Sequence, residues 1–360
     1  MAHLIARSAR LRGVAVIVAA GALVAASSAI GSVASSSPRL PGVTPERVVT
    51  EMIRAVAGDP SVSGQVAAHL DLGLPDLPHA SAAAAPGPAA LLDSLSGDHR
   101  LRVLHSRDGS RLSDLVTAGE RSIVVSRTQA WLWDSTTMTA VRLGAGADTG
   151  AEAVRTAASL IDPVDLARRA LQALDASTAV SVSGTVSVAG RDAYVLTLRP
   201  RTSATLVGRV ELFVDAKRWL PLGGAIFARG ATGPAVSVRF TSVSFERVDP
   251  GVYRFQPPPG AKVITAHGRE TNGEQRGTGA AGPSDVRVFG RGWAAILAVR
   301  VSSSAVLRRA TAGSGFDPQS FLPFSGTLFS VNLVNRGDHG WLTFGAVPKA
   351  ALERVSAELP

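Results

Sequence analysis

The sequence predicts an α+β fold in which one large antiparallel β-sheet is accompanied by α-helices. Three observations predict it: a series of about eleven short strand-like runs, two capped amphipathic helices, and a smaller mixed segment at the C-terminus. Short runs joined by tight turns are typical of an antiparallel meander. With 360 residues, of which 46% are hydrophobic and 18% charged, the chain is long and apolar enough for a large folded core.

Two segments are expected to form helices that pack on the sheet. Thr44 followed by Pro45 is typical of a helix start, because threonine caps the first turn and proline suits the first helical position. Asp162-Pro163 begins a second helix in the same way. In each helix, apolar residues recur at helical spacing. These residues are Val48, Val49, Met52, Ile53 and Val56 in the first helix, and Leu166, Ala167, Ala170, Leu171 and Leu174 in the second.

The strand-like runs fall into two groups, before and after the second helix. They are Val62–Leu72, Arg100–Ser106, Arg111–Ala118, Ser122–Thr128, Ala130–Asp134 and Thr139–Leu143, then Ala179–Ala189, Ala193–Arg199, Leu206–Asp215, Leu222–Arg229 and Ala235–Glu246.

Apolar and charged residues alternate along Arg209–Asp215, with Phe213 as the exception on the charged side, which predicts a half-buried strand. In the last run the alternation shifts near Thr241-Ser242, which predicts a β-bulge. A tight turn and a short strand, ended by Pro257–Gly260, are expected next.

The first 34 residues are expected to direct the rest of the chain out of the cytoplasm. Arginines at 7, 10 and 12 precede the uncharged apolar run Gly13–Ala26, and the charge-free stretch continues to Ala34. A signal peptide cleaved at Ser32-Val33-Ala34 and an uncleaved anchor of ~20 charge-free residues both fit this pattern. In either case we expect the remainder to be extracytoplasmic, either anchored to the cytoplasmic membrane or secreted.

Residue usage argues against several classes of function. The chain has no cysteine, which excludes disulfides and cysteine nucleophiles. The net charge of +9 comes almost wholly from arginines that are scattered among apolar residues instead of forming a basic helix or stripe, so no nucleic-acid partner is expected. A basic surface favours an anionic membrane surface instead.

No motif predicts catalysis, a metal or a cofactor. The seven histidines include no close ligand pair, and no carboxylate is arranged in the sequence to orient His99 or His105. Most acidic residues fall in turns, where the burial that acid–base catalysis needs is not expected. Gly277–Gly282 matches GxGxxG, but it lies in a polar linker and a proline follows. The chain is therefore expected not to be an enzyme, although a Ser–His–Asp site assembled in space stays open.

Several stretches together resemble the extracytoplasmic lipoprotein carriers and sorting proteins of the LolA/LolB-like family, in its membrane-anchored actinobacterial form. The resemblance covers Pro41–Val263. The stretches are LPGVTPERVV, DLGLPDLP, GDHRLRV, QAWLWDSTTMTAVRL, VAGRDAYVLTLRPR, TLVGRVELFVDAKRWLPL, FARG and VSVRFTSVSFERVDPGVYRFQPPPGAKV. The family fold is an unclosed, strongly curved antiparallel β-barrel, or half-barrel, capped by α-helices.

The resemblance implies non-enzymatic binding of a lipid or lipoprotein acyl chain in an apolar barrel, for sorting or carriage. Trp131 and Trp133 are expected to lie on one face of a short strand. They could either pack beneath a helix or form part of the wall that contacts a ligand. With them, the wall candidates are Leu196, Val210, Leu212, Val214, Phe227, Val236, Val238 and Phe240. The lid candidates on the first helix are Val48, Met52 and Ile53.

The expected domains are the N-terminal segment 1–34, the half-barrel 41–264, a flexible linker 265–285 and a small α+β region 286–360. In the last region strands are expected in Val286–Val299, Leu328–Asn335 and Trp341–Val347, and helices in Ser302–Arg309 and Lys349–Glu358. A carrier-like domain with a smaller second one is similar to the RseB-like regulators, which act on an anti-sigma factor. The alternative function is therefore that of an envelope sensor that binds a membrane anti-sigma factor or another envelope partner.

Overall fold

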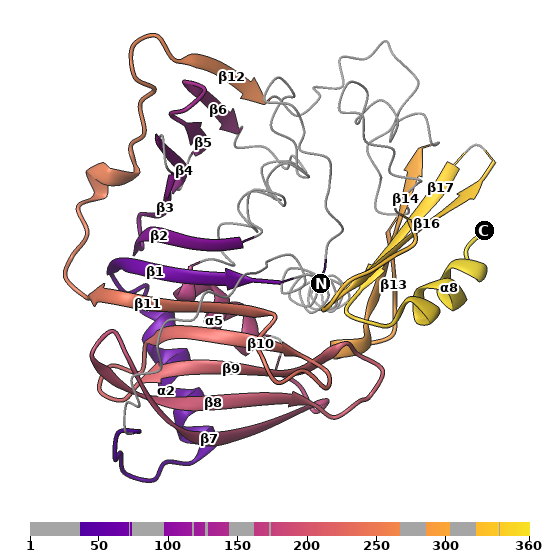
Figure 1. Ribbon diagram of the computed structural model, residues 1–360, viewed down its shortest axis with the longest axis horizontal. Coiled ribbons are helices and arrows are strands. Elements are labelled where there is room, and N and C mark those ends of the chain that lie inside the picture. The colour runs from indigo at the N-terminus through magenta and orange to yellow at the C-terminus, as the bar shows by residue number, and fades with distance from the viewer. Residues whose placement is uncertain are drawn as a thin grey trace, which may run out of the picture.

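A computed structural model describes residues 37–71, 73, 97–116, 119–126, 129–143, 162–172, 174–266, 286–302, 322–337 and 339–360. Within these ranges the chain forms two β-sheets and three α-helices (Figure 1). The predicted N-terminal segment 1–34, nearly all of the predicted linker and nearly all of the predicted helix at 302–309 lie outside the described residues. No helix in the described part is both long and apolar enough to span a membrane.

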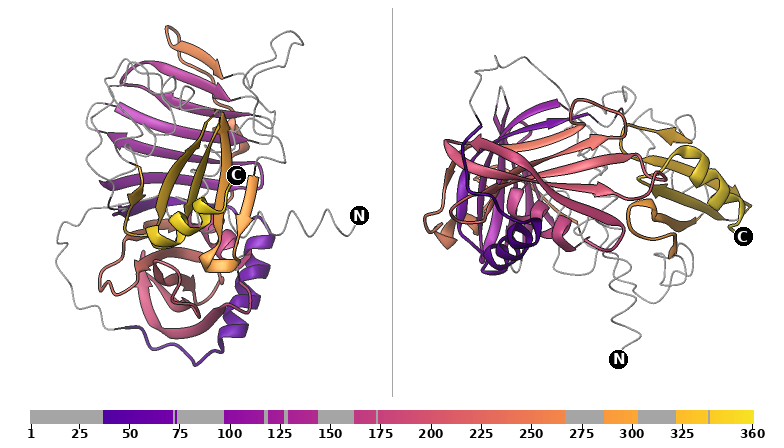
Figure 2. Two further views of the ribbon diagram at one scale, coloured as in Figure 1. Left: turned by 90° about the vertical axis from the view of Figure 1, so that its right-hand side faces the viewer. Right: turned by 90° about the horizontal axis from the view of Figure 1, so that it is seen from below.

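The larger sheet has twelve strands in the order β12-β6-β5-β4-β3-β2-β1-β11-β10-β9-β8-β7. The order begins at β12 and ends at β7, so the strongly curved sheet does not close on itself (Figures 1 and 2). The predicted large, unclosed, mainly antiparallel sheet is confirmed. The strands are β1 (Val62–Leu70), β2 (Gly97–Ser106), β3 (Gly109–Val116), β4 (Gly119–Ser126), β5 (Ala130–Asp134), β6 (Thr139–Leu143), β7 (Thr178–Val188), β8 (Arg191–Pro200), β9 (Val207–Asp215), β10 (Pro221–Ala228), β11 (Val236–Ser244) and β12 (Lys262–Ala266).

The sequence prediction was wrong about the segment that follows β11. A 3₁₀ turn, η1 (Pro250–Tyr253), replaces the expected short strand. The Asp249 carboxylate accepts a hydrogen bond from the Gly251 N–H, and Pro250 fixes the backbone at the first position of the turn, so both residues favour a turn. The strand β12 then pairs in parallel with β6, where the linker had been expected to begin.

Both predicted helix starts are confirmed. The helix α2 (Pro45–Ala57) begins after Thr44, whose side-chain oxygen accepts a hydrogen bond from the Arg47 N–H at 3.3 Å. The helix α5 (Pro163–Gln172) begins after Asp162, whose carboxylate accepts one from the Val164 N–H at 2.9 Å. Each cap pairs a backbone donor that the helix itself leaves unpaired.

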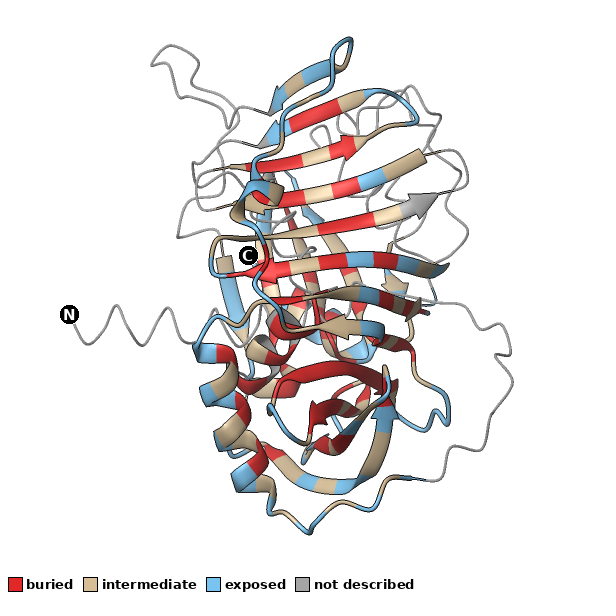
Figure 3. Cartoon of the chain, turned by 90° about the vertical axis from the view of Figure 1, so that its left-hand side faces the viewer, coloured by how far each residue is buried: buried red, intermediate tan, exposed pale blue. Residues whose placement is uncertain are grey.

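Alternate side chains of the twelve strands share one face, which we call the inner face because α2 and α5 pack against it. Val48 and Met52 of α2 and Val164 of α5 belong to one buried cluster with inner-face residues of β1 and β8–β11. Figure 3 shows these buried residues in red. The inner-face members are Val66, Ala68, Leu70, Leu196, Leu198, Val210, Leu212, Val214, Leu222, Ile226, Val236, Val238 and Phe240.

The predicted β-bulge near Thr241 is confirmed. Gln65 of β1 pairs with Ser242, whereas the next residue, Val66, pairs with Phe240, so Thr241 is the extra residue. Such a bulge reverses the side-chain alternation beyond it and bends the strand. Because of it, Val243, which pairs with Gly64, faces the same side as Phe240 although it lies three residues farther along the strand.

The outer face of β9–β11 carries aromatic rings covered by arginines. The guanidinium of Arg239 lies 4.6 Å from the ring centre of Phe213, and that of Arg209 lies 3.4 Å from the ring centre of Phe227. These stacked contacts explain how Phe213 is buried on the charged side of its strand. Gly223 lies between Phe213 and Arg239 in the register, so no side chain separates the two.

The smaller sheet has five strands in the order β13-β14-β17-β16-β15, and α8 covers one of its faces. Leu352 of α8 packs with Ile296, and the predicted strands and final helix of the C-terminal region are confirmed. The elements are β13 (Val286–Phe289), the 3₁₀ turn η3 (Gly292–Ala294), β14 (Ile296–Ser302), β15 (Phe324–Ser325), β16 (Ser330–Arg336), β17 (His339–Gly345) and α8 (Lys349–Ala357).

The smaller sheet contacts the ends of β7 and β9 of the larger sheet. The carbonyl oxygen of Ala346 accepts hydrogen bonds from the Leu206 N–H at 2.8 Å and from the Thr205 hydroxyl at 2.6 Å. The Trp293 indole donates to the Thr178 hydroxyl at 2.8 Å, and both Trp293 and Ala346 belong to the main buried cluster. The domain boundaries themselves stay a prediction.

We expect Gly223→Ala to lower the free energy of unfolding by about 1–3 kcal/mol. The backbone φ of Gly223 is +155°, and a Cβ there would lie 2.3 Å from the Val238 carbonyl oxygen and 2.9 Å from the Arg239 Cα. Urea unfolding followed by tryptophan fluorescence measures the change. Gly233→Ala is the control, because nothing lies within 4 Å of a Cβ at that position. Equal midpoints for the two variants would contradict this account of Gly223.

Candidate functional site

The inner face of β2–β6 and β12 continues the apolar surface beyond the part that α2 and α5 cover. The register aligns one residue from each strand into a single row, which we call the apolar row. Its members are Val103, Leu112, Ile123, Leu132, Val141 and Ile264. With neighbouring strands about 4.8 Å apart, the row is on the order of 24 Å long.

Half of the apolar row lies away from the described helices. Leu132, Val141 and Ile264 pack with Ala130 in a cluster that contains no residue of α2, α5 or α8, and Leu132 and Ile264 are half-buried. Ile123 lies at the boundary, because it packs against both this cluster and the main one. By contrast, Val103 and Leu112 are buried in the main cluster beside the helices. The inner face therefore changes along the sheet from a helix-covered core to a half-buried apolar surface.

A polar row borders the apolar row on β3–β6 and β12, two residues along each of these strands; on β2 the aligned residue is Leu101. Its members are Asp114, Arg121, Asp134, Thr139 and Lys262. Arg121 Nε lies 3.1 Å from an Asp134 carboxylate oxygen, and His99 Nδ1 lies 2.9 Å from one of Asp114. Burial raises the pKa of Asp134, but hydrogen bonds from Thr136 and Thr137 and the charge of Arg121 outweigh it and hold the pKa below its ordinary value.

A second apolar surface lies on the smaller sheet, on the face opposite α8. On β13, β14, β16 and β17 the register places eleven residues there, of which nine are aliphatic or phenylalanine and two, Gly340 and Asn335 at one end, are not. None of the nine belongs to a buried cluster of described residues. This face is turned toward the inner side of the larger sheet (Figures 1 and 2). Its residues are Val286, Val288, Leu297, Val299, Val301, Val331, Leu333, Leu342 and Phe344.

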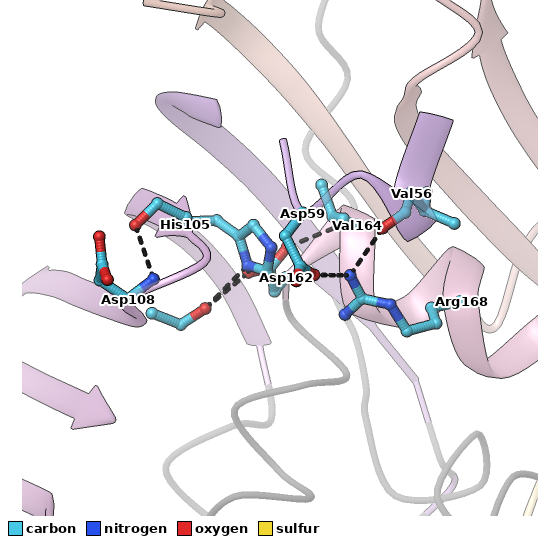
Figure 4. Close-up of polar contacts among 9 residues, drawn as sticks. Val56, Asp59, His105, Asp108, Asp162, Val164 and Arg168 are labelled. Carbon is cyan, nitrogen blue, oxygen red and sulfur yellow. Dashed lines mark hydrogen bonds and ion pairs between the residues drawn. The ribbon is translucent and has the colours of Figure 1, made fainter. Parts of the chain in front are cut away.

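A buried ion pair joins the start of α5 to the inner face. The Asp162 carboxylate lies 2.6 Å from His105 Nδ1 of β2 and accepts a hydrogen bond from the Ser110 hydroxyl of β3 at 3.0 Å (Figure 4). Burial raises the pKa of Asp162, but the charge of His105 and hydrogen bonds from His105, the Val164 N–H and Ser110 outweigh it, so the pKa lies below its ordinary value.

The arrangement of these three residues is not that of a nucleophilic triad. In a triad the carboxylate and the serine occupy opposite nitrogens of the imidazole. Here Ser110 Oγ and Asp162 both approach His105 Nδ1, at 2.9 and 2.6 Å, and the serine hydroxyl donates to the aspartate. The geometry fits a structural link. In the described ranges, no three His, Asp or Glu side chains are placed to hold a metal ion.

Both His99 and His105 have a carboxylate partner, so the prediction that no carboxylate orients them was wrong. The partner of His105 lies 57 residues away, and that of His99 lies on the neighbouring strand. Asp162 had been identified only as a helix cap. Neither pairing has a local signal, because each depends on which strands become neighbours.

Arg168 ties α5 to the end of α2. Its guanidinium donates to the Val56 carbonyl oxygen at 3.0 Å and to the Asp59 carboxylate at 3.1 Å (Figure 4). Together with the Asp162 link, this contact makes the sheet, α5 and α2 one connected assembly.

Most predicted wall residues come together in the helix-covered core. Val48 and Met52, two of the three lid candidates, are buried in the same cluster, whereas Ile53 is 46% exposed. Phe227 lies on the outer face under Arg209. The wall candidates in the inner core are Leu196, Val210, Leu212, Val214, Val236, Val238 and Phe240. Their role toward a ligand stays a prediction.

Trp131 and Trp133 lie on the outer face, opposite Leu132. Both rings contact Phe255, with ring centres 5.5 and 5.8 Å apart, in a small cluster separate from the main core. Phe255 belongs to the connection from β11 to β12, which passes along the outer side of β2–β6 (Figure 1). Their common face was expected, whereas alternation alone could not tell which face it would be.

No protein-family model matches the chain, and no curated protein does. Among solved structures, MucB in the Pseudomonas aeruginosa MucA/MucB complex is similar at 15% identity and a TM-score of 0.46, over 87% of this chain and 96% of that one. A LolA superfamily protein from Nitrosomonas europaea is similar at 12% identity and 0.24, over 59% and 99%. A putative outer membrane lipoprotein-sorting domain from Vibrio parahaemolyticus is similar at 11% identity and 0.26, over 58% and 97%.

These matches are to RseB-like and LolA-like proteins, the two groups that the sequence also resembles. With TM-scores below 0.5, they carry no argument about what the chain does. The case for a function therefore rests on the geometry of the two apolar surfaces and the polar row.

We expect Asp162→Asn to lower the free energy of unfolding by about 3–5 kcal/mol near neutral pH, because it leaves one member of a buried ion pair without its counter-charge. The depressed pKa of Asp162 gives the dependence on pH. Its charged form contributes fully above the ordinary value of 3.8, and the contribution is lost as pH falls through the folded-state pKa. Urea unfolding between about pH 3 and 7 measures both effects.

The matched control for this prediction is Asp59→Asn. Asp59 pairs with Arg168 at a position exposed to solvent, where such a pair contributes at most about 1 kcal/mol. A gap between wild type and Asp162→Asn that stays constant down to about pH 3 would contradict the assignment of a charged Asp162.

Proposed function

We propose that this protein binds a lipid or lipoprotein acyl chain, without catalysis, on the inner face of its half-barrel. The binding site is the apolar row, and the protein acts in lipid or lipoprotein sorting or carriage outside the cytoplasmic membrane. The observation that carries the proposal is a continuous apolar row across six strands, half of which lies away from the described helices.

An acyl chain suits this surface because it has no hydrogen-bonding group to satisfy. Every member of the apolar row is aliphatic. Transfer of a chain from water contributes on the order of 0.8 kcal/mol per buried methylene, so a chain of ~16 carbons supplies ample binding energy. A row on the order of 24 Å long also accepts an extended chain instead of a compact ligand.

In this proposal the helix-covered half holds the sheet together, and the ligand binds beside it. Residues such as Val210 and Leu212 are buried in one cluster with Val48 and Met52, so a ligand reaches them only if the helices move. The half-buried part of the apolar row requires no such displacement. The proposed ligand therefore enters beside Leu132 and Ile264, and the helices keep the other half of the sheet folded.

The experiment that tests the proposal is native mass spectrometry of the purified full chain, followed by solvent extraction. An adduct that extracts as a fatty-acyl lipid supports acyl binding. A protein that carries no lipid and takes up none from added vesicles overturns the proposal, and a protein partner then becomes the first target.

We expect Ile264→Glu to weaken acyl-lipid binding at least tenfold, because burial of one large aliphatic side chain contributes about 1.5–3 kcal/mol and the glutamate adds a charge. Val263→Glu is the control: Val263 is the preceding residue on the same strand, points to the opposite face and is 51% exposed. Uptake of a fluorescent fatty acid measures both. Equal loss in the two variants would argue against a site on the inner face.

A second candidate function is regulation through a protein partner in the envelope, as in RseB-like proteins. The apolar face of the smaller sheet favours it, because nine aligned apolar residues with no described core around them are typical of an interaction surface. In that case a membrane protein such as an anti-sigma factor is the partner.

The two functions are separated by Leu342→Glu on the smaller sheet. We expect this variant to keep acyl-lipid uptake within about twofold of wild type, since a site on the larger sheet does not contain Leu342. Loss of a co-purifying membrane protein with unchanged lipid uptake would assign the smaller sheet to partner binding. A large loss of lipid uptake would contradict a ligand held by the larger sheet alone.

A further inference from the structure

We propose that Lys262 binds the anionic head group of the acyl ligand, with the polar row forming the head-group end of the site. This inference rests on the proposed function and adds the chemical class of the ligand: an amphiphile with one acyl chain beside a carboxylate or phosphate group.

The register gives the site two ends of different chemistry. Lys262, Thr139 and Asp134 align across β12, β6 and β5. Two residues farther along the same strands, Ile264, Val141 and Leu132 align in the same way. Two residues of a strand span about 6.6 Å, so the polar and apolar rows lie side by side at that distance on one face. An amphiphile requires such a border between polar and apolar surface.

The charges of the polar row are paired except at Lys262. Arg121 pairs with Asp134, and Asp114 pairs with His99. Asp134 also accepts hydrogen bonds from the Thr136 N–H at 2.8 Å and from the Thr137 N–H at 3.4 Å, which occupies its other oxygen. Within the described ranges, Lys262 forms no ion pair, and its backbone N–H donates to the Met138 carbonyl oxygen. Lys262 is therefore the cation of the polar row that can bind an anionic head group, because Asp134 and Asp114 already pair with other side chains.

The position of Lys262 also has a simpler explanation, which the experiment must distinguish from head-group binding. The strand β12 lies at the edge of the sheet, and an edge lysine discourages pairing with a foreign strand. A lysine with that role alone does not distinguish an anionic amphiphile from a neutral one. A lysine that binds a head group does.

The test compares photoreactive lipids of one chain length on the full chain in phosphatidylcholine vesicles. The probes are a 16-carbon fatty acid, the corresponding alcohol and a lysophosphatidate, used at about pH 8.5, where a carboxylate is ionised and a lysine amine is protonated. Mass spectrometry of labelled peptides from β5, β6 and β12 gives the yield. Competition with the unlabelled lipids gives the affinities.

We expect Lys262→Gln to lower affinity for the acid about two- to fivefold, the range of a solvent-exposed ion pair, and to leave affinity for the alcohol unchanged. Lys262→Arg should retain binding of the acid. The control is Lys217→Gln, an exposed lysine in the turn between β9 and β10, which should change neither affinity. A larger loss for the lysophosphatidate than for the acid would identify phosphate as the preferred head group.

The outcomes keep this inference apart from the proposed function. Equal affinities of wild type and Lys262→Gln for every probe, or an equal loss for acid and alcohol, would overturn the head-group assignment while acyl binding stands. If none of the probes labels β5, β6 or β12 of the wild type, the proposed function itself fails. Labelling that depends on both the negative charge and Lys262 supports the inference.

Discussion

The fold depends on one constraint: a single apolar face, kept in register across twelve strands, must be removed from water. Sheet curvature and two helices meet this constraint on one half, where Val48, Met52 and Val164 complete a buried core with β1 and β8–β11. The bulge at Thr241 keeps Val243 on the same inner side as Phe240 while the strand bends. The other half keeps the same apolar pattern without a described helix beside Leu132 and Ile264, and this difference between the halves is why we propose the ligand site there.

Asp162 connects the covered half to the rest of the sheet. One carboxylate caps α5, pairs with His105 and accepts a hydrogen bond from Ser110, so it fixes the start of the helix against β2 and β3. A buried carboxylate without these partners would be strongly unfavourable. The same residues could have suggested a hydrolase, but their approach to a single imidazole nitrogen is consistent with a structural role. Arg168 extends the connection to α2.

The sequence predicted the features that have local causes. Caps and helical spacing located α2 and α5, alternation located the strands, and its shift located the bulge. Features that depend on strand neighbours could not be predicted in this way. Phe213 looked like an exception because its cover, Arg239, reaches it across Gly223 from two strands away. The ion pair of His105 joins residues 57 apart, and the parallel pairing of β12 follows from its return to β6.

The proposed ligand is placed on the half-buried part of the sheet because of the free energy needed to exchange helix surface for an acyl chain. On the covered half, an acyl chain must displace apolar helix surface, and the area lost from the core offsets the area that the ligand buries at the same ~25 cal/mol per Å². Beside Leu132 and Ile264 no described helix is displaced, so the burial of the chain contributes more of its free energy to binding. In the proposed site the helix-covered core stabilises the sheet, and we expect the apolar row and Lys262 at its polar border to set the affinity.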